Sequence, residues 1–146
     1  MVTEKITDPV LGDEGRLFGG AEPGWVSFKK EFAPTKARVL ILASFVNGSV
    51  PQAERDLYRE IEAWYPQGVY EAYEAILRKV RENPAATELT SLEEIQNRLQ
   101  LIKIDIRIPL PRPATCVLIY RFDPNAPVWY VRIGEDYHVE WCGLGD

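Results

Sequence analysis

The fold is decided by the stretch Leu101-Ile102-Lys103-Ile104-Asp105-Ile106-Arg107-Ile108. Its isoleucines recur at every second position, so Ile102, Ile104, Ile106 and Ile108 face one way, while Lys103, Asp105 and Arg107 face the other. This period of two predicts a β-strand with one dry side and one wet side. Such a strand belongs to a sheet that is covered on a single face.

Further apolar or alternating runs predict the other strands. They comprise a short strand around residues 16–18 and longer ones at 25–32, 38–46, 115–122, 128–133 and 137–141. The run 38–46 is apolar at almost every position, which predicts a central strand covered on both faces. If the final turn has three residues, Trp129 lies opposite Trp141 and Val131 lies opposite Val139.

Two segments between these strands predict helices. Residues 49–81 carry apolar side chains at spacings of three to five, with Ser49 as a possible cap and Pro66 and Gly68 as interruptions that predict a kink or two abutting helices. Ser91 predicts a capped short helix that ends near Leu99. We therefore expect residues 1–146 to form one α+β domain, in which an antiparallel sheet of six to seven strands packs one face against a long kinked helix and a short helix.

Composition narrows the classes of partner. The 146 residues carry 17 basic and 22 acidic side chains, and the net charge of −5 opposes a phosphate backbone, so we expect no nucleic-acid partner. The N-terminus has no apolar signal region, and no stretch approaches the roughly 20 apolar residues of a membrane span. We therefore expect a cytoplasmic protein without a membrane partner, and its oligomeric state stays open.

Cysteine and proline give little chemistry. Cys116 and Cys142 lack the spacing of a metal site or a redox pair, which favours two buried thiols. Residues 83–87 predict a linker, and the three prolines of residues 109–113 predict a stiff connection that cannot extend a sheet interior.

The candidate catalytic residues cluster in the last hairpin. His138 is the single histidine, which excludes a histidine-rich metal site and any mechanism with two imidazoles within one chain. Asp136 and Glu140 flank it, and the three could serve a cleft for a small molecule or a reaction. Solvated strand and turn residues are the simpler interpretation, so we predict no enzyme, no cofactor and no metal.

The candidate partner surface lies on the long helix. Tyr58, Tyr65 and Tyr70 fall off its main apolar stripe, and the helix is rich in acidic residues, among them Glu54, Glu62 and Glu74. Exposed tyrosines and carboxylates suit a protein interface, although a solvated face partly paired with Arg55 and Arg59 is the simpler interpretation of the charges.

Several motifs resemble a family of small bacterial domains of unknown function. They are the opening Asp8-Pro9-Val10-Leu11-Gly12, the tryptophan strand at Trp25, the helix start Val50-Pro51-Gln52-Ala53-Glu54-Arg55 and the hairpin Trp129-Tyr130-Val131-Arg132-Ile133-Gly134-Glu135-Asp136. Members of such families occur among the immunity proteins of bacterial toxin systems. The resemblance implies a cytoplasmic protein that blocks a toxin by binding it, and it implies no catalytic residues.

We therefore predict a non-enzymatic protein-binding domain with a basic protein partner, of which an immunity-type protein is the most concrete form. A small-molecule-binding domain or enzyme with a cleft near His138 is the alternative. A third possibility is an interaction domain of a larger assembly, which would make its contact through the proline-rich loop or an edge strand.

Overall fold

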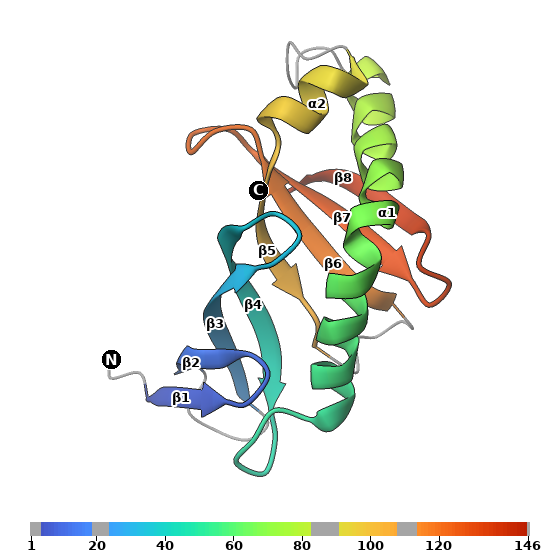
Figure 1. Ribbon diagram of the computed structural model, residues 1–146. Helices are drawn as coiled ribbons and strands as arrows, with labels where there is room; N and C mark the ends of the chain where they lie inside the picture. The colour runs from blue at the N-terminus through green and yellow to red at the C-terminus, as the bar shows by residue number, and fades with distance from the viewer. Residues whose placement is uncertain (1–3, 19–23, 83–90, 108–113, 146) are drawn as a thin grey trace.

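One eight-stranded sheet organises the molecule (Figure 1). The computed structural model describes residues 4–18, 24–82, 91–107 and 114–145. The strands lie in chain order across the sheet: β1 (Lys5–Asp8), β2 (Gly12–Phe18), β3 (Gly24–Phe32), β4 (Ala37–Phe45), β5 (Gln100–Asp105), β6 (Ala114–Arg121), β7 (Val128–Gly134) and β8 (Val139–Gly145). The α+β class is confirmed, whereas the predicted strand number of six to seven is too low.

The sheet is mixed, which corrects the predicted antiparallel arrangement. Every neighbouring pair is antiparallel except β4 and β5, which are parallel, with Leu40 opposite Lys103. Helices α1 (Gln52–Glu82) and α2 (Leu92–Arg98) lie between these two strands in the chain and return it to the end where β4 began. A crossover of this length makes a parallel pair possible, so two antiparallel meanders meet along one parallel seam.

The first strand escaped prediction because its turn contains proline and glycine. Asp8 organises this turn, since its Oδ2 accepts hydrogen bonds of 2.9 Å from the main-chain nitrogens of both Val10 and Leu11. Gly12 follows with a φ of 101°, a conformation that glycine adopts without steric cost. The density of turn residues therefore builds a tight hairpin between β1 and β2.

A bulge changes the predicted faces of β5. Leu101 pairs with Tyr120 and Lys103 pairs with Ile119, so Ile102 is an extra residue without its own partner. Leu101 therefore joins Ile104 and Ile106 in the core, whereas Ile102 is only half-buried. The predicted dry face holds for Ile104 and Ile106 and is wrong for Ile102, and Ile108 lies outside the described residues.

Helix α1 is continuous through Pro66, so the prediction of two abutting helices is wrong (Figure 1). A kink at this proline stays a prediction. The helix begins at Gln52, after Val46 and Ser49 have closed a turn through reciprocal main-chain hydrogen bonds. Its buried positions include a stripe with spacings of three and four residues, which is the pattern of a helix that rests on a sheet: Glu54, Tyr58, Ile61, Tyr65, Val69, Ala72, Ile76 and Val80.

Both helices lie on the same side of the sheet in Figure 1, so one face carries the core. In β4, Val39, Ile41 and Ala43 are buried, whereas the alternating Leu40 and Leu42 are half-buried. The prediction that this strand is central is confirmed. The prediction that it is covered on both faces is wrong for the described part of the chain.

Helix α2 agrees closely with its sequence signals. Ser91 is its N-cap, and the Ser91 hydroxyl accepts a 3.2 Å hydrogen bond from the main-chain nitrogen of Glu94. The predicted linker at residues 83–87 and the proline-rich loop at residues 109–113 lie outside the described residues. In the part that the structure describes, neither helix combines the length and apolar character needed to cross a membrane.

The register of the final hairpin differs from the prediction. Trp129 pairs with Leu144 and Val131 with Cys142, while Trp141 pairs with Arg132 on the uncovered face. The connection runs through residues 135–138 rather than three residues, and an irregularity between Arg132 and Ile133 shifts the pairing further. Cys142 and Cys116 are buried free thiols, as predicted.

Candidate functional site

The predicted partner surface on α1 is largely turned into the protein. Glu54 has an exposed fraction of 0%, and its Oε1 accepts a 2.6 Å hydrogen bond from the main-chain nitrogen of Ser44. Tyr58 and Tyr65 are exposed by only 1% and 3%. The prediction that these two tyrosines lie off the buried stripe is wrong, and all three side chains lie too deep to contact a partner.

The sequence pattern left these tyrosines out of the buried stripe of α1. Tyrosine nevertheless suits burial, because its side chain is a large apolar ring with only one polar atom. The Tyr58 hydroxyl donates to Glu62 at 3.1 Å, and the Tyr65 hydroxyl hydrogen-bonds the hydroxyl of Tyr120 at 2.8 Å. Once the hydroxyl has a partner, burying the ring is favourable. The three remaining predicted residues are Glu62, which is half-buried, and Tyr70 and Glu74, which are exposed.

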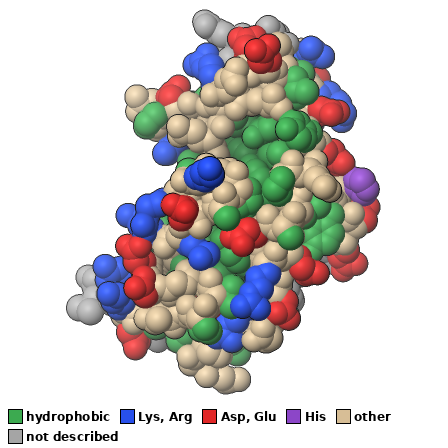
Figure 2. Space-filling model, in the orientation of Figure 1, with side chains coloured by type: hydrophobic (Ala, Val, Ile, Leu, Met, Phe, Trp, Pro, Cys, Tyr) green, Lys and Arg blue, Asp and Glu red, His purple; other side chains and the backbone are tan. Residues whose placement is uncertain are grey.

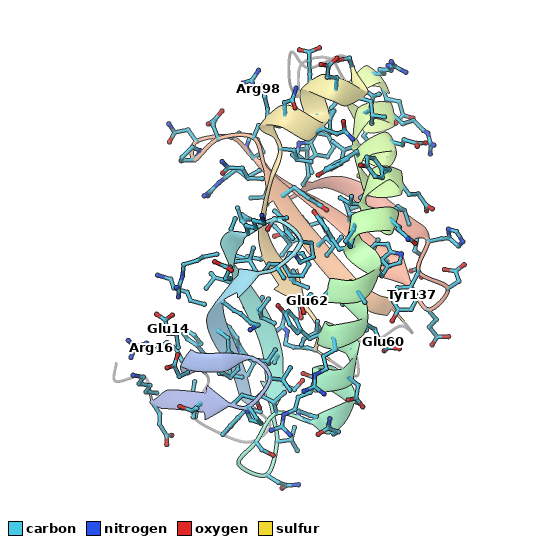
Figure 3. All side chains as sticks on the ribbon, viewed as in Figure 1. Glu14, Arg16, Glu60, Glu62, Arg98 and Tyr137 are labelled. Atoms are coloured by element: carbon cyan, nitrogen blue, oxygen red, sulfur yellow. The ribbon has the colours of Figure 1, made fainter. Side chains whose placement is uncertain are left out.

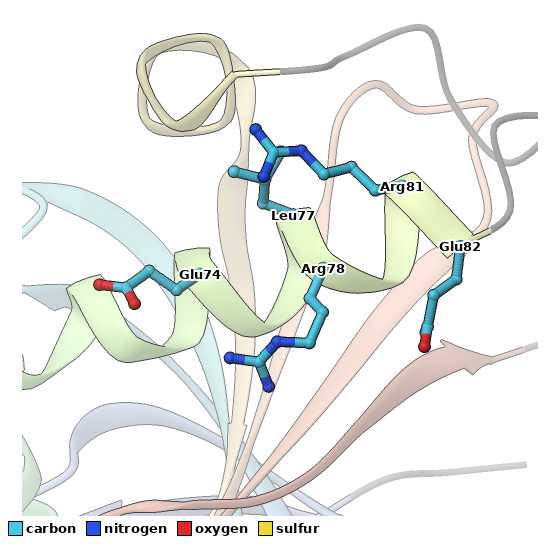
Figure 4. Close-up of a pocket in the computed structure, with 5 residues that line it drawn as sticks. All are labelled: Glu74, Leu77, Arg78, Arg81 and Glu82. Atoms are coloured by element: carbon cyan, nitrogen blue, oxygen red, sulfur yellow. The ribbon is translucent and has the colours of Figure 1, made fainter.

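A depression of about 390 Å³ lies beside Glu74 near the end of α1. The described residues that line it all come from α1 and include charges of both signs: Glu74, Leu77, Arg78, Arg81 and Glu82. Figure 4 shows that Leu77 and Arg81 point toward α2, whereas Arg78 and Glu82 point away from it. Because these side chains do not converge, we do not assign a site here.

The turn between β7 and β8 brings the other candidate residues together. The Gly134 main-chain nitrogen donates to the His138 carbonyl oxygen at 2.9 Å, and the Tyr137 main-chain nitrogen donates to the Gly134 carbonyl oxygen at 3.0 Å. Asp136 Oδ1 accepts a 3.1 Å hydrogen bond from the main-chain nitrogen of His138. His138 is therefore a turn residue, whereas the sequence pattern placed it within a strand.

Glu71 of α1 holds this turn in place. Its Oε1 lies 2.8 Å from His138 Nδ1, and its Oε2 accepts a 2.5 Å hydrogen bond from the Val139 nitrogen. The carboxylate of Glu71, assisted by Asp136, raises the pKa of His138 above its usual 6.5. The same contact with His138, together with the Val139 N–H, lowers the pKa of Glu71.

The sequence places Glu71 among the acidic residues of the long helix but does not connect it with His138. The two residues are 67 positions apart in the chain. Only the packing of α1 against β8 brings the two together. No local spacing could have indicated this pair.

A second contact attaches the turn to α1. The Tyr137 ring lies 5.8 Å from the Trp64 ring, centroid to centroid. Burial raises the pKa of Tyr137, and a hydrogen-bonded Glu60 carboxylate raises it further. Figure 3 shows Glu60 and Tyr137 on the same side of the molecule, where the middle of α1 meets this turn.

The surroundings of the turn carry mainly negative charge. We define the acidic patch as Glu60, Glu71, Glu135, Asp136 and Glu140, all contributed by α1 or by the β7–β8 hairpin. Arg132 lies 3.9 Å from Glu140 and is half-buried. In Figure 2 the single histidine lies at the edge of the molecule among carboxylates. The patch therefore presents a concentrated negative surface to solvent.

The same residues give limited means for catalysis. Asp136, His138 and Glu140 line a shallow depression of about 390 Å³ with Gly134, Glu135 and Val139, so the three predicted residues do lie together. Among its described lining residues, Val139 is the one branched apolar side chain, and the His138 side chain is 69% exposed. Within the described ranges, no group of three or more histidine, cysteine or carboxylate residues lies close enough to hold a metal ion.

No family model, curated protein or solved structure matches this chain. The resemblance to small bacterial domains of unknown function therefore depends on the sequence motifs alone. Membership in that family stays a prediction.

Proposed function

We propose that this protein is a non-enzymatic protein-binding domain that docks on a basic partner through the acidic patch. One observation carries the proposal: five carboxylates from α1 and the β7–β8 hairpin gather around a turn that Glu71 fixes. A surface of one charge accelerates encounter with a partner of opposite charge and favours it over other partners.

The attachment of the turn supports this role. Glu71 makes two hydrogen bonds to residues 138 and 139, and Trp64 packs against Tyr137. A surface that is already ordered loses less conformational entropy on binding than a mobile loop does. The patch can therefore contribute to affinity as well as to the rate of encounter.

Tyr70 adds a contact of a different kind. It is 49% exposed and precedes Glu71 on α1. Tyrosine is enriched among the residues that dominate binding energy at interfaces. In this proposal, the partner covers the Tyr70 ring while its basic side chains face the carboxylates.

The most concrete partner is a bacterial toxin with a basic surface, which would make this protein an immunity-type protein of the cytoplasm. This finer statement comes from the resemblance of its sequence motifs. The acidic patch is compatible with it, because blocking a basic surface by binding requires no catalytic residue.

The first experiment is affinity capture of the tagged chain from its native cell, at low and at moderate salt, followed by mass spectrometry. We expect a basic protein that is retained at low salt and lost at moderate salt, because screening weakens attraction between exposed charges. Recovery of no protein at either salt concentration would count against the proposal.

The decisive comparison uses two charge reversals with the captured partner. Glu135→Lys lies in the acidic patch, whereas Asp13→Lys changes an exposed carboxylate on β2. We expect the first to lower the association rate constant about tenfold and the second to leave it nearly unchanged. Equal effects of the two variants would show that net charge alone matters, and the docking site would have to be sought elsewhere.

A small-molecule site at His138 is the alternative, and the Glu71 contact favours it. A carboxylate at Nδ1 leaves Nε2 available for proton exchange. We rank this function second because, among the described residues that line the depression, only Val139 has a branched apolar side chain to contact a ligand. Screening by NMR, with His138 as the reporter, tests it: a ligand that shifts His138 and Asp136 together would support a cleft.

A further inference from the structure

The face of the sheet that the helices leave uncovered carries a cluster of basic side chains. On β4, Arg38, Leu40 and Leu42 alternate with the buried Val39 and Ile41, so they point away from α1. Figure 3 shows Glu14 and Arg16 of β2 on the side of the molecule away from α1. This face gathers basic side chains although the chain as a whole is acidic.

A groove of about 390 Å³ crosses this face. We define the basic groove by the seven residues that line it, from β3, β4, β5 and β6: Lys29, Arg38, Val39, Leu40, Ile102, Lys103 and Arg121. Four are cationic, three are apolar, and none of the described residues that line it is acidic. Such a composition is unexpected in a chain with a net charge of −5.

The strand register places the cations around a common centre. Lys29 pairs with Leu40, and Leu40 pairs with Lys103, so two lysines flank Leu40 on adjacent strands. Neighbouring strands lie about 4.8 Å apart, which separates the two lysine Cα atoms by roughly 10 Å. Their side chains are long enough to reach one small anion held above Leu40.

Most of this positive charge has no ion-pair partner among the residues that the structure describes. Arg38 forms an ion pair with Glu14 and lies opposite Glu31 in the register. Lys29, Lys103 and Arg121 form no ion pair with any of the described residues. Three positive charges therefore repel one another across the groove.

Arg121 provides a second, independent observation. Its Nε is buried and has no hydrogen-bond partner among the residues that the structure describes. A buried donor without an acceptor is costly, and a charged donor is more costly still. An oxyanion in the groove would supply this acceptor and offset the repulsion among the cations.

We propose that the basic groove binds a small organic molecule that carries a phosphate group or several carboxylate groups. Three uncompensated cations favour a multiply charged anion over a single carboxylate. Arg121 and the two lysines contact the oxyanion, while Leu40 and Ile102 contact the apolar part of the molecule. The groove volume lies within the usual range of small-molecule sites, about 300–1,000 Å³.

Isothermal titration calorimetry with three probes tests the proposal on the intact chain. Pyrophosphate and citrate carry several charges, whereas acetate carries one. We expect 1:1 binding of pyrophosphate or citrate and at least tenfold weaker binding of acetate. Tighter pyrophosphate binding assigns a phosphate ligand and tighter citrate binding a polycarboxylate; acetate binding as tight as both, or binding of none of the three, overturns the proposal.

Matched variants locate the binding. Lys29→Gln and Lys103→Gln should each weaken the better probe about tenfold, whereas Arg78→Gln, an exposed arginine of α1, should not. Because Lys29 is exposed, its variant should fold even if Arg121→Gln does not. A loss of binding in Arg78→Gln equal to that in Lys103→Gln would overturn the assignment to the groove.

This site does not depend on the proposed protein-binding function. Glu135→Lys, which alters the acidic patch, should leave pyrophosphate binding unchanged. Failure of the anion to bind would leave the partner-docking proposal intact, and failure of partner capture would leave the groove intact.

Discussion

At the scale of single residues, Glu71 has the greatest influence on the candidate site. Its two oxygens engage His138 and Val139, so one carboxylate holds both the imidazole and the first main-chain nitrogen of β8. The contact lowers the pKa of Glu71 and raises the pKa of His138. Each one is stabilised in its charged form by the other.

We predict a pH window for this contact. The raised pKa of His138 means that its contribution is complete below about pH 6.5 and is lost as the pH rises through the folded-state value. The lowered pKa of Glu71 means that its contribution is present above about pH 4.5 and is lost as the pH falls through its own folded-state value. The turn is therefore held most firmly in mildly acidic solution.

NMR titration of the His138 imidazole checks this prediction. We expect a pKa above 6.5 in the unmodified protein and a fall toward 6.5 in Glu71→Gln. Glu74→Gln is the matched control, since it removes a carboxylate that lies one helical turn away and is exposed. The same His138 pKa in all three proteins would contradict the contact.

The Tyr65 and Tyr120 hydroxyls form a second critical contact between side chains. Both rings are buried, and one hydroxyl donates to the other over 2.8 Å. Tyr65→Phe leaves the buried Tyr120 hydroxyl with one hydrogen-bond partner fewer, and Tyr120→Phe does the same to Tyr65. Each substitution should therefore lower the free energy of unfolding by about 1–3 kcal/mol. The double variant should lose less than the sum, because it removes both partners.

Urea unfolding of the two single variants and the double variant measures this coupling. Tyr70→Phe serves as the control, since its hydroxyl belongs to a half-exposed side chain. Its effect should stay within about 0.5 kcal/mol. Strict additivity of the two core changes would show that the hydroxyls do not stabilise each other.

At the scale of elements, α1 depends on one glycine in its interior. A Cβ on Gly68 would lie 1.9 Å from Cε2 of the Trp64 ring, which rests over this position one turn away. Trp64 in turn packs against Tyr137 of the candidate site. The glycine therefore allows α1 to carry a large ring that supports the β7–β8 turn.

We predict that Gly68→Ala destabilises the protein although alanine favours helices by about 1 kcal/mol over glycine. The added methyl group must displace the Trp64 ring, and overpacking of this kind costs roughly 1–3 kcal/mol. Unfolding in urea and a shift of tryptophan fluorescence measure the effect. Gln67→Ala, at an exposed neighbouring position, is the control, and a stabilising Gly68→Ala would refute this role of glycine.

Some elements could be predicted from the sequence because their signals are local. The Ser91 cap of α2 and the strand predicted at residues 25–32 both depend on neighbours in the chain, and both are confirmed. The bulge at Ile102 and the register of Trp141 depend on pairing with another strand, which alternation alone does not fix. Tyr58 and Tyr65 were misplaced because their hydroxyl partners were unknown.

At the scale of the whole molecule, the difference between local and long-range contacts also explains which residues of the acidic patch and the basic groove could be grouped from the sequence. Asp136, His138 and Glu140 lie within five residues of one another, so their grouping was predictable. Glu71 comes from a helix that the chain builds much earlier, and the basic groove collects cations from β3, β4, β5 and β6. Sequence order does not indicate which positions a folded sheet brings together.

The two sites also give the molecule a division of charge that its net value of −5 conceals. The acidic patch lies where α1 meets the β7–β8 turn, and the basic groove lies on the sheet face away from the helices. A net charge describes behaviour at long range, whereas recognition depends on the local surface. The expectation of a basic protein partner and the proposed anion site are therefore compatible.

The parallel seam between β4 and β5 also governs how the chain can fold. Seven pairings hold the sheet together. In six of them the two strands are separated by a short connection, whereas both helices lie between β4 and β5. The pairing of Leu40 with Lys103 alone must wait until the chain containing both helices has been brought back. The entropy of long-loop closure is thus concentrated in a single step, and the rate of that step should limit the folding of the whole sheet.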